Sequence, residues 1–171
     1  MTDEIRLFEG KRFSVVRVRQ ATPTGIHERE IVRHIGSVTI VPLVDDDHVC
    51  LIRNERPAVG KTLIELPAGT REPGEPAEVT ARRELAEETG YRASRWERLP
   101  GFYLSPGILD ERMELFMARE LTAGVPAREA GEQIENLVLS WSEIDRQIDE
   151  GGIEDAKTLV GLYLARRRRG L

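Results

Sequence analysis

The stretch that decides the fold is Gly69–Tyr91, which reads GTREPGEPAEVTARRELAEETGY. It predicts a helix over Glu75–Gly90, because Pro76 suits a first helical position and Gly90 can adopt the left-handed conformation that ends a helix. Small apolar residues recur on one face of this helix, at Ala77, Ala81 and Leu85. We therefore expect this face to pack on a sheet.

Three glutamates crowd the C-terminal end of the same helix: Glu84, Glu87 and Glu88. At about 100° per residue, Glu84 and Glu88 lie within about 40° of each other, on the apolar side. The helix dipole disfavours negative charge at this end, so the crowding indicates a neutralising cation. Oxygen ligands suit hard ions, Mg²⁺ or Mn²⁺. Arg83 precedes Glu87 by four residues and can pair with it and orient it.

Alternating and β-branched segments around the helix predict strands. Two form an opening pair, Arg12–Gln20 and Ile26–His34, and an acidic turn at 45–47 predicts a hairpin of Ser37–Val44 with His48–Asn54. Further strands are expected at Thr62–Leu66, Glu97–Leu104, Met113–Arg119 and Leu137–Trp141, then a short helix from Ser142 and a last one over about Glu154–Arg168. The class is α/β or α+β, a mixed β-sheet sandwiched between helices.

The composition predicts one domain with an extension: an N-terminal antiparallel strand extension over residues 1–36 and the main domain over 37–171. The opening MTDEIRLFEG has neither a basic start nor an apolar run, so we expect no signal peptide and no membrane span. Cys50 is the only cysteine, which favours the cytoplasm. The net charge of -5 gives no general attraction to nucleic acid, and the basic run 166–169 suits the C-terminus of a helix.

The spacing of the helix and its preceding loop resembles the Nudix family. The Nudix box is matched at all seven fixed letters, which are Gly69, Glu75, Arg83, Glu84, Glu87, Glu88 and Gly90. Tyr91 departs from it, since the family prefers an aliphatic residue there. The resemblance implies a Nudix fold in which Glu84 and Glu88 are the principal metal ligands, Glu87 is a further ligand and the carbonyl of Ala68 completes the shell.

In the same resemblance, Glu75 and Arg83 brace the loop and the helix, so that Arg83 and Glu87 belong to the catalytic group. The chemistry is attack of water on a diphosphate. Divalent ions neutralise the charge of the diphosphate, align the water and stabilise the leaving phosphate.

Segments outside the box resemble the ADP-ribose pyrophosphatases. Pro106 follows Gly90 by sixteen positions, and Arg56 in NERPAVG matches an arginine directed at the substrate diphosphate. The segment GIEDAKTLVGLYLA is similar to the closing helix of these enzymes, so the resemblance covers about residues 30–168. We expect substrate contacts from Arg56, Pro106 and Glu111.

The water also needs a carboxylate that the metal does not engage. The family often places it on an acidic loop after the sheet, and Glu132 matches that position best, with Glu135 second. Glu129 lies in the same segment, so the sequence leaves the choice open. His34 is a base by residue type, but a lone histidine at a strand end is assigned no role.

The function expected from the sequence is metal-dependent hydrolysis of ADP-ribose to AMP and ribose 5-phosphate. The alternatives are a nucleotide-sugar pyrophosphatase of the GDP-mannose type, a sensor that binds ADP-ribose without cutting it, and an RNA-processing hydrolase. The expected partners are the small-molecule substrate and a second copy of the chain, joined through the N-terminal strands. No nucleic-acid or membrane partner is expected.

Overall fold

The structure is a computed structural model that describes residues 4–128, 131 and 133–170. Its elements in chain order are β1 (Glu4–Glu9), β2 (Phe13–Thr22), β3 (Gly25–His34), β4 (Ser37–Pro42), β5 (His48–Arg56), β6 (Lys61–Glu65), β7 (Ala68–Thr70), α1 (Ala77–Glu84), the π-helical turn η1 (Leu85–Thr89), β8 (Arg92–Tyr103), β9 (Arg112–Thr122), β10 (Ile134–Ser140), α2 (Trp141–Asp149) and α3 (Ala156–Arg169).

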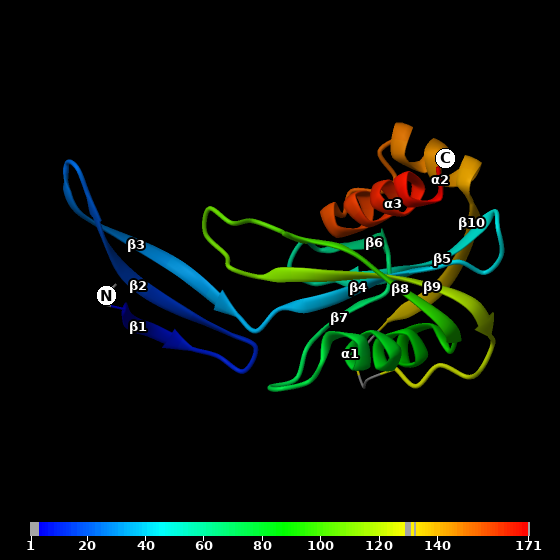
Figure 1. Cartoon of the computed structure of the whole chain (residues 1–171), viewed down its shortest axis with the longest axis horizontal. Coiled ribbons are helices and arrows are strands. Elements are labelled where there is room, and N and C mark those ends of the chain that lie inside the picture. The colour runs from blue at the N-terminus through cyan, green and yellow to red at the C-terminus, as the bar shows by residue number, and fades with distance from the viewer. Residues whose placement is uncertain (1–3, 129–130, 132, 171) are drawn as a thin grey trace.

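The N-terminal strands form a separate antiparallel sheet in the order β1-β2-β3, which projects from the rest of the molecule (Figure 1). The sequence predicted two of these strands and missed β1, whose six residues are all exposed and therefore show no core-facing pattern. The sheet is joined to the domain by β3. The amide of Val32 donates to the carbonyl of Ile108 at 2.8 Å, and the amide of Asp110 donates to the carbonyl of Val32 at 3.1 Å.

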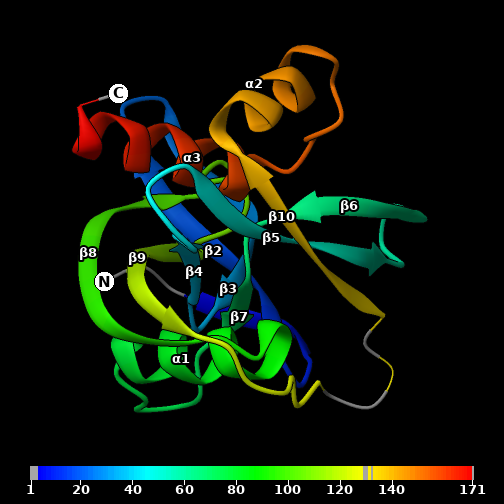
Figure 2. The same cartoon turned by 90° about the vertical axis from the view of Figure 1, so that its right-hand side faces the viewer.

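Two further sheets lie between the helices, with strand orders β7-β4-β9-β8 and β10-β5-β6. The first is mixed, since β4 and β9 pair in parallel and the other pairs are antiparallel. Helix α1 covers one side, whereas α2 and α3 cover the other (Figures 1 and 2). In β4, Ile40 packs toward α1 and the adjacent Val41 packs in the opposite cluster, as alternation along a strand requires. The expected class, a mixed sheet arrangement sandwiched by helices, is confirmed.

The predicted hairpin of residues 37–44 with 48–54 is wrong. Strands β4 and β5 belong to different sheets, and a single bridge between Leu43 and Val49 is the pairing recorded between these two segments. Strand β4 is buried along its whole length, and both its edges are occupied by β7 and β9. The turn at 45–47 therefore carries the chain from one sheet to the next, a choice made by pairing with distant strands.

The predicted helix over 75–90 is shorter and less regular than expected. Pro76 is the N-cap and not the first helical residue, and α1 passes after Glu84 into a π-helical turn. Gly90, at φ 79°, ends the turn in the left-handed conformation, as predicted. The apolar face of α1 packs on the sheet as expected, where Ala81 and Leu85 join Ile40 in one cluster.

The two C-terminal helices have well-defined starts. Ser140 forms a capping box with Glu143 for α2, and Asp155 caps α3 by accepting from the amide of Thr158. Gly161 lets α3 approach the sheet, since a Cβ there would lie 2.5 Å from a methyl group of Leu66.

The basic run at the end of α3 is largely engaged within the protein. Arg166 forms two hydrogen bonds with Asp145, at 2.5 and 2.8 Å, and Arg168 pairs with Glu97. Arg169 donates to the carbonyl of Asp46. In the part of the chain that the structure describes, no helix is long and apolar enough to cross a membrane.

Candidate active site

The loop before α1 and the helix itself meet at Gly69. A Cβ at this position would lie 2.0 Å from the carboxylate carbon of Glu84, so only glycine leaves room for that side chain. One residue earlier, the backbone amide of Ala68 donates to Oε2 of Glu88 at 2.9 Å. Glu88 is 4% exposed. The short strand β7 thus holds two of the three predicted ligand carboxylates against its backbone.

Glu75 fastens the loop to the helix. Its carboxylate accepts hydrogen bonds from the Thr80 hydroxyl at 2.8 Å and the Glu72 amide at 3.1 Å, and Arg83 pairs with it at 3.3 Å. The hydrogen bond from Arg83, aided by those from Glu72 and Thr80, lowers the pKa of Glu75 to about 2. Glu75 is therefore ionised at neutral pH and connects the loop to α1.

Arg83 lies among the acidic side chains of the helix. Its Nη1 atom donates to Glu84 at 2.8 Å and to Glu87 at 3.0 Å. Burial alone lowers the pKa of Arg83, but the hydrogen bond to Glu75 and the charge of Glu84 raise it above its ordinary value. Arg83 orients both carboxylates and partly offsets their charge.

A pocket of about 600 Å³ opens over this cluster. Of the predicted metal-binding, catalytic and substrate-contact residues, seven line it: Arg56, Ala68, Arg83, Glu84, Glu87, Glu88 and Glu111. They come from β5, from β7, from the helix formed by α1 and η1 (the catalytic helix), and from the segment before β9. These elements are far apart in the sequence. The fold therefore brings the metal-ligand candidates and two of the three substrate-contact candidates to one surface.

Arg56 is held by a buried carboxylate that sequence reasoning missed. Glu65, 1% exposed, accepts from Arg56 Nε at 2.8 Å and Nη2 at 2.7 Å, and also from Lys157 Nζ at 2.5 Å. Burial by itself raises the pKa of Glu65, yet Arg56 and Lys157 outweigh it, so the pKa lies below its ordinary value. Two cations around one carboxylate leave positive charge at the pocket wall, where phosphate oxygens can bind.

Lys157 is fixed from both sides, since it also pairs with Asp155 at 3.0 Å. Asp155 is the N-cap of α3, so the start of this helix delivers the lysine to the pocket. Lys157 and Glu65 are 92 positions apart. The sequence signal for Glu65 was a charge within an otherwise apolar segment, whereas Lys157 follows Glu154 and Asp155 and had no such signal.

Glu111 lies at the pocket beside Ser37 and His34. The Ser37 hydroxyl donates to Glu111 at 2.5 Å, and His34 Nδ1 lies 3.6 Å from the same carboxylate. His34 Nδ1 also accepts from the amide of Gly36 at 3.1 Å. His34 does not itself line the pocket among the described residues.

Two of the predicted site residues lie elsewhere. Pro106 lines a separate pocket of about 210 Å³, next to Tyr103 and Ile108. Glu135 belongs to β10, opposite Arg53 of β5, and its 72% exposed side chain lies 3.6 Å from that arginine. The expectation that Glu135 sits in a loop is therefore wrong, because antiparallel pairing with β5 begins at Ile134. Glu132 and Glu129 lie outside the described residues.

The donor set at this site fits a hard divalent cation. All three helix side chains offer carboxylate oxygens, and Glu84 and Glu87 already converge on a single cationic nitrogen of Arg83. Within the ranges that the structure describes, no group of three His, Cys, Asp or Glu side chains is arranged as a metal site.

The chain is similar in sequence and structure to known proteins. The chain is 32% identical to an ADP-ribose pyrophosphatase of Bacillus subtilis over 169 residues, 97% of this chain and 91% of that protein. It is 37% identical to a GDP-mannose pyrophosphatase of Cronobacter sakazakii over 145 residues, 78% of this chain and 75% of that protein. A solved structure described as an ADP compounds hydrolase matches with a TM-score of 0.83 and 23% identity, covering 98% of this chain and 92% of that one.

The model of the NUDIX domain matches residues 33–160, which include the whole loop and helix described above. Members of this family generally need a divalent metal, in keeping with the carboxylate cluster. The chain belongs to the Nudix hydrolase family.

Proposed function

We propose that the protein hydrolyses the diphosphate bond of ADP-ribose, giving AMP and ribose 5-phosphate, with Mg²⁺ as the working metal. The observation that carries the proposal is the shared pocket. Its lining includes the helix carboxylates together with Arg56 and Lys157, which supports a diphosphate that contacts both a metal site and two fixed cations. The ADP-ribose pyrophosphatase that aligns with nearly the whole chain supports this substrate over others.

In this proposal Glu84 and Glu88 are the principal metal ligands, with Glu87 and the Ala68 carbonyl as further ligands. The bound metal supplies charge neutralisation and activation of water. Arg56 and Glu111 bind the substrate in the main pocket, and Pro106 remains the third proposed substrate contact, in a separate pocket. Arg83 acts by orienting Glu84 and Glu87.

Glu132 is proposed to orient or deprotonate the attacking water. Glu135 is the weaker alternative, since it lies in β10 and faces Arg53. Glu132→Gln should lower kcat more than it weakens metal binding, and a larger loss from Glu135→Gln would reverse the assignment.

The test is a comparison of kcat/KM for ADP-ribose, GDP-mannose, UDP-glucose and a nucleoside triphosphate, with Mg²⁺ and with EDTA. We expect ADP-ribose to be the best substrate and EDTA to abolish turnover. A preference of about tenfold or more for GDP-mannose would favour the second candidate, which the Cronobacter relative supports. Binding of ADP-ribose without release of AMP would mark a sensor.

The metal assignment has its own test. Glu84→Gln and Glu88→Gln should each reduce kcat by at least about a hundredfold, because a carboxamide is a poor ligand for Mg²⁺. Arg82→Gln is a matched control on the same helix, since Arg82 is exposed and pairs with Glu78 away from the pocket. Near wild-type turnover of folded Glu88→Gln would overturn the assignment.

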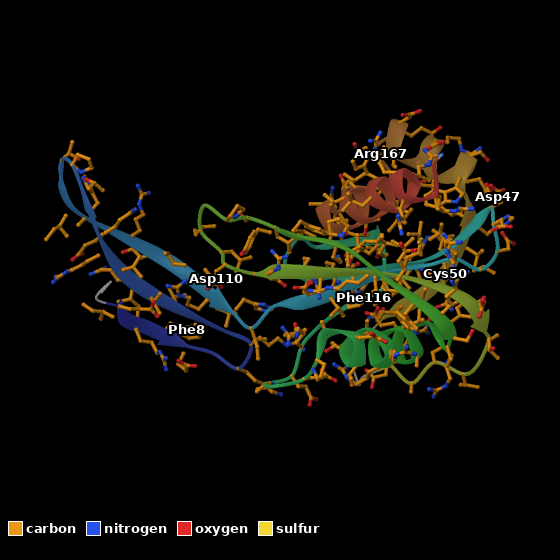
Figure 3. The ribbon with its side chains drawn as sticks, viewed as in Figure 1. Phe8, Asp47, Cys50, Asp110, Phe116 and Arg167 are labelled. Carbon is orange, nitrogen blue, oxygen red and sulfur yellow. The ribbon has the colours of Figure 1, made fainter. Side chains whose placement is uncertain are left out.

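We further propose that the protein is a cytoplasmic homodimer joined through the N-terminal sheet, with a small molecule as its substrate and no nucleic-acid partner. The projecting sheet exposes large apolar side chains, among them Phe8 at 51% and Ile26 at 73%. Phe8 is labelled on this sheet in Figure 3. Strands β1 and β3 are its edges. A second copy of the sheet would cover both the apolar side chains and an edge.

A further inference from the structure

Six basic residues line the main pocket: Lys11, Arg12, Arg56, Arg71, Arg83 and Lys157. Four of them are held by other groups. Arg56 and Lys157 share Glu65, and Arg71 donates two hydrogen bonds to the carbonyl of Glu75, at 3.1 and 2.7 Å. Arg83 is bound to the carboxylates of Glu75, Glu84 and Glu87. The positions of these four cations are therefore accounted for by the loop before α1, by the helix, and by the pocket wall formed by Arg56 and Lys157.

Lys11 and Arg12 are different. Both are exposed, and within the described part of the chain neither makes a hydrogen bond or an ion pair. The two cations of this turn are therefore available to a ligand. Two exposed cations side by side at a pocket offer positive charge to an anionic ligand.

The turn that carries these residues is nevertheless firmly placed. The amide of Gly10 donates to the carbonyl of Phe13 at 2.9 Å, and the rings of Phe8 and Phe13 pack 5.7 Å apart beside it. A Cβ at Gly10 would lie 2.8 Å from the Phe8 ring and 2.9 Å from the Phe13 carbonyl. Backbone and apolar contacts thus fix the turn, and the side chains of Lys11 and Arg12 take no part in these contacts.

The position of the turn fits a second anion-binding point in the same pocket. It belongs to the N-terminal sheet and lies beside the loop that precedes α1 (Figure 1), whereas Arg56 and Lys157 come from β5 and α3. A pocket of about 600 Å³ is in the range that holds a nucleotide-sized ligand. Such a ligand can place its diphosphate at the carboxylates and present another group to the turn.

We propose that Lys11 and Arg12 bind a further phosphate of the substrate, remote from the diphosphate that is cut. The preferred substrate is then a nucleoside diphosphate derivative that carries a third phosphate on one of its sugars. This inference rests on the proposed function of the pocket. Arginine offers a fork of donors to phosphate oxygens and lysine a compact charge, so the pair suits a phosphate better than a hydroxyl.

The test compares ADP-ribose with two derivatives, one phosphorylated on the adenosine ribose and one on the terminal ribose. For each we would measure kcat/KM with the wild type, the Lys11→Ala/Arg12→Ala double variant and Arg29→Ala. Arg29 is the matched control: it is an exposed arginine of the same sheet, without an ion pair among the described residues, and it does not line the pocket.

We expect the wild type to prefer one derivative over ADP-ribose by about fivefold or more, the size that one or two exposed charge pairs provide. The double variant should lose this preference, Arg29→Ala should keep it, and added salt should weaken it. The derivative that is preferred identifies which sugar faces the turn. No preference in the wild type, or an equal preference in the double variant, overturns the proposal.

Calorimetric binding of the same three compounds in EDTA distinguishes failure of the proposed function from failure of the anion site. If no compound is hydrolysed but a phosphorylated derivative binds the wild type more tightly than the double variant, the anion site stands and the proposed activity fails. If ADP-ribose is hydrolysed but the wild type and the double variant bind the derivatives equally or not at all, the anion site fails alone.

Discussion

Single side chains decide most of the chemistry of this site. Gly69 is required by the carboxylate of Glu84, Glu75 ties the loop to Arg83, and Glu65 fixes Arg56. Gly69 acts by leaving room, whereas Glu75 and Glu65 are buried or half-buried charged groups that are each satisfied by a partner, as burial of charge demands. We therefore expect substitutions of these positioning residues to damage the site as substitutions of the metal ligands do.

Replacing Gly69 with alanine should damage catalysis more than folding. The added methyl group would meet the carboxylate of Glu84, the far end of a flexible side chain, so the fold can yield while the carboxylate is displaced. We expect kcat to fall by about tenfold or more. The thermal midpoint should move by only a few degrees, about the shift for 1 kcal/mol.

Gly107→Ala is the control for this change, because nothing lies within 4 Å of a Cβ at Gly107. Kinetics and thermal unfolding of both variants provide the measurement. If Gly69→Ala unfolds the protein at room temperature, or leaves kcat unchanged, the contact with Glu84 has been misjudged.

Glu75 should make stability depend on pH in the acid range. Its pKa is about 2 in the folded protein because of Arg83, below the ordinary value of 4.5. A depressed folded pKa contributes stability that is fully present above pH 4.5 and is lost as the pH falls toward 2. Urea midpoints measured from pH 6 to pH 3 should therefore fall less steeply for Glu75→Gln than for the wild type. Parallel curves would mean that Glu75 does not titrate in this way.

At the scale of elements, the catalytic helix is a composite. Its regular part, α1, ends at Glu84, and Glu87 and Glu88 lie in the π-helical turn that follows. Turns of this kind are rare and are found often at functional sites. The turn changes the angle between Glu84 and Glu88 from the α-helical value assumed in the sequence analysis, while the preceding α1 keeps its apolar face on the sheet.

Helix α2 depends on its cap and should respond to loss of it. The Ser140 hydroxyl accepts from the Glu143 amide at 3.3 Å, and the Glu143 carboxylate accepts from the Ser140 amide at 2.8 Å. Ser140→Ala should lower the free energy of unfolding by about 0.5–2 kcal/mol. Chemical denaturation would measure the change, with Asp149→Ala as a control at an exposed position of the same helix. Since α2 lies on the far side of the sheets from α1, kcat for the best substrate should be unchanged, and a large loss of kcat would contradict this separation.

At the scale of the whole molecule, the pocket depends on contributions from both the projecting sheet and the main domain. The N-terminal sheet is attached through β3 and supplies Lys11 and Arg12, while the domain supplies the carboxylates and Arg56.

The proposed dimer predicts that a charge on the projecting sheet disrupts assembly. Phe8→Glu places a carboxylate on an exposed apolar surface of β1, and we expect a monomer at micromolar concentration by light scattering. Tyr163→Glu changes a comparably exposed ring on α3, at 61%, and should leave the dimer intact. A monomeric wild type with full activity would refute the dimer.

Sequence alone determined the features that depend on near neighbours along the chain. Four such features fall within the 23 residues from Gly69 to Tyr91. They are the helix, the glycine that ends it, the three glutamates, and the pairing of Arg83 with Glu75. Local spacing fixes which side chains share a face, so family and metal chemistry follow from it. Arg56 and Glu111 were also located, through resemblance of their surrounding segments.

Only the tertiary structure decided what depends on contacts between distant segments. It placed β4 and β5 in different sheets, moved Glu135 from a loop into a strand, and separated Pro106 from the main pocket. It also joined Glu65 to Lys157 across 92 positions and brought the β1–β2 turn to the carboxylates. Strand pairing and ion pairing at such separations are set by the packing of the whole chain. Local periodicity of the sequence does not report on that packing.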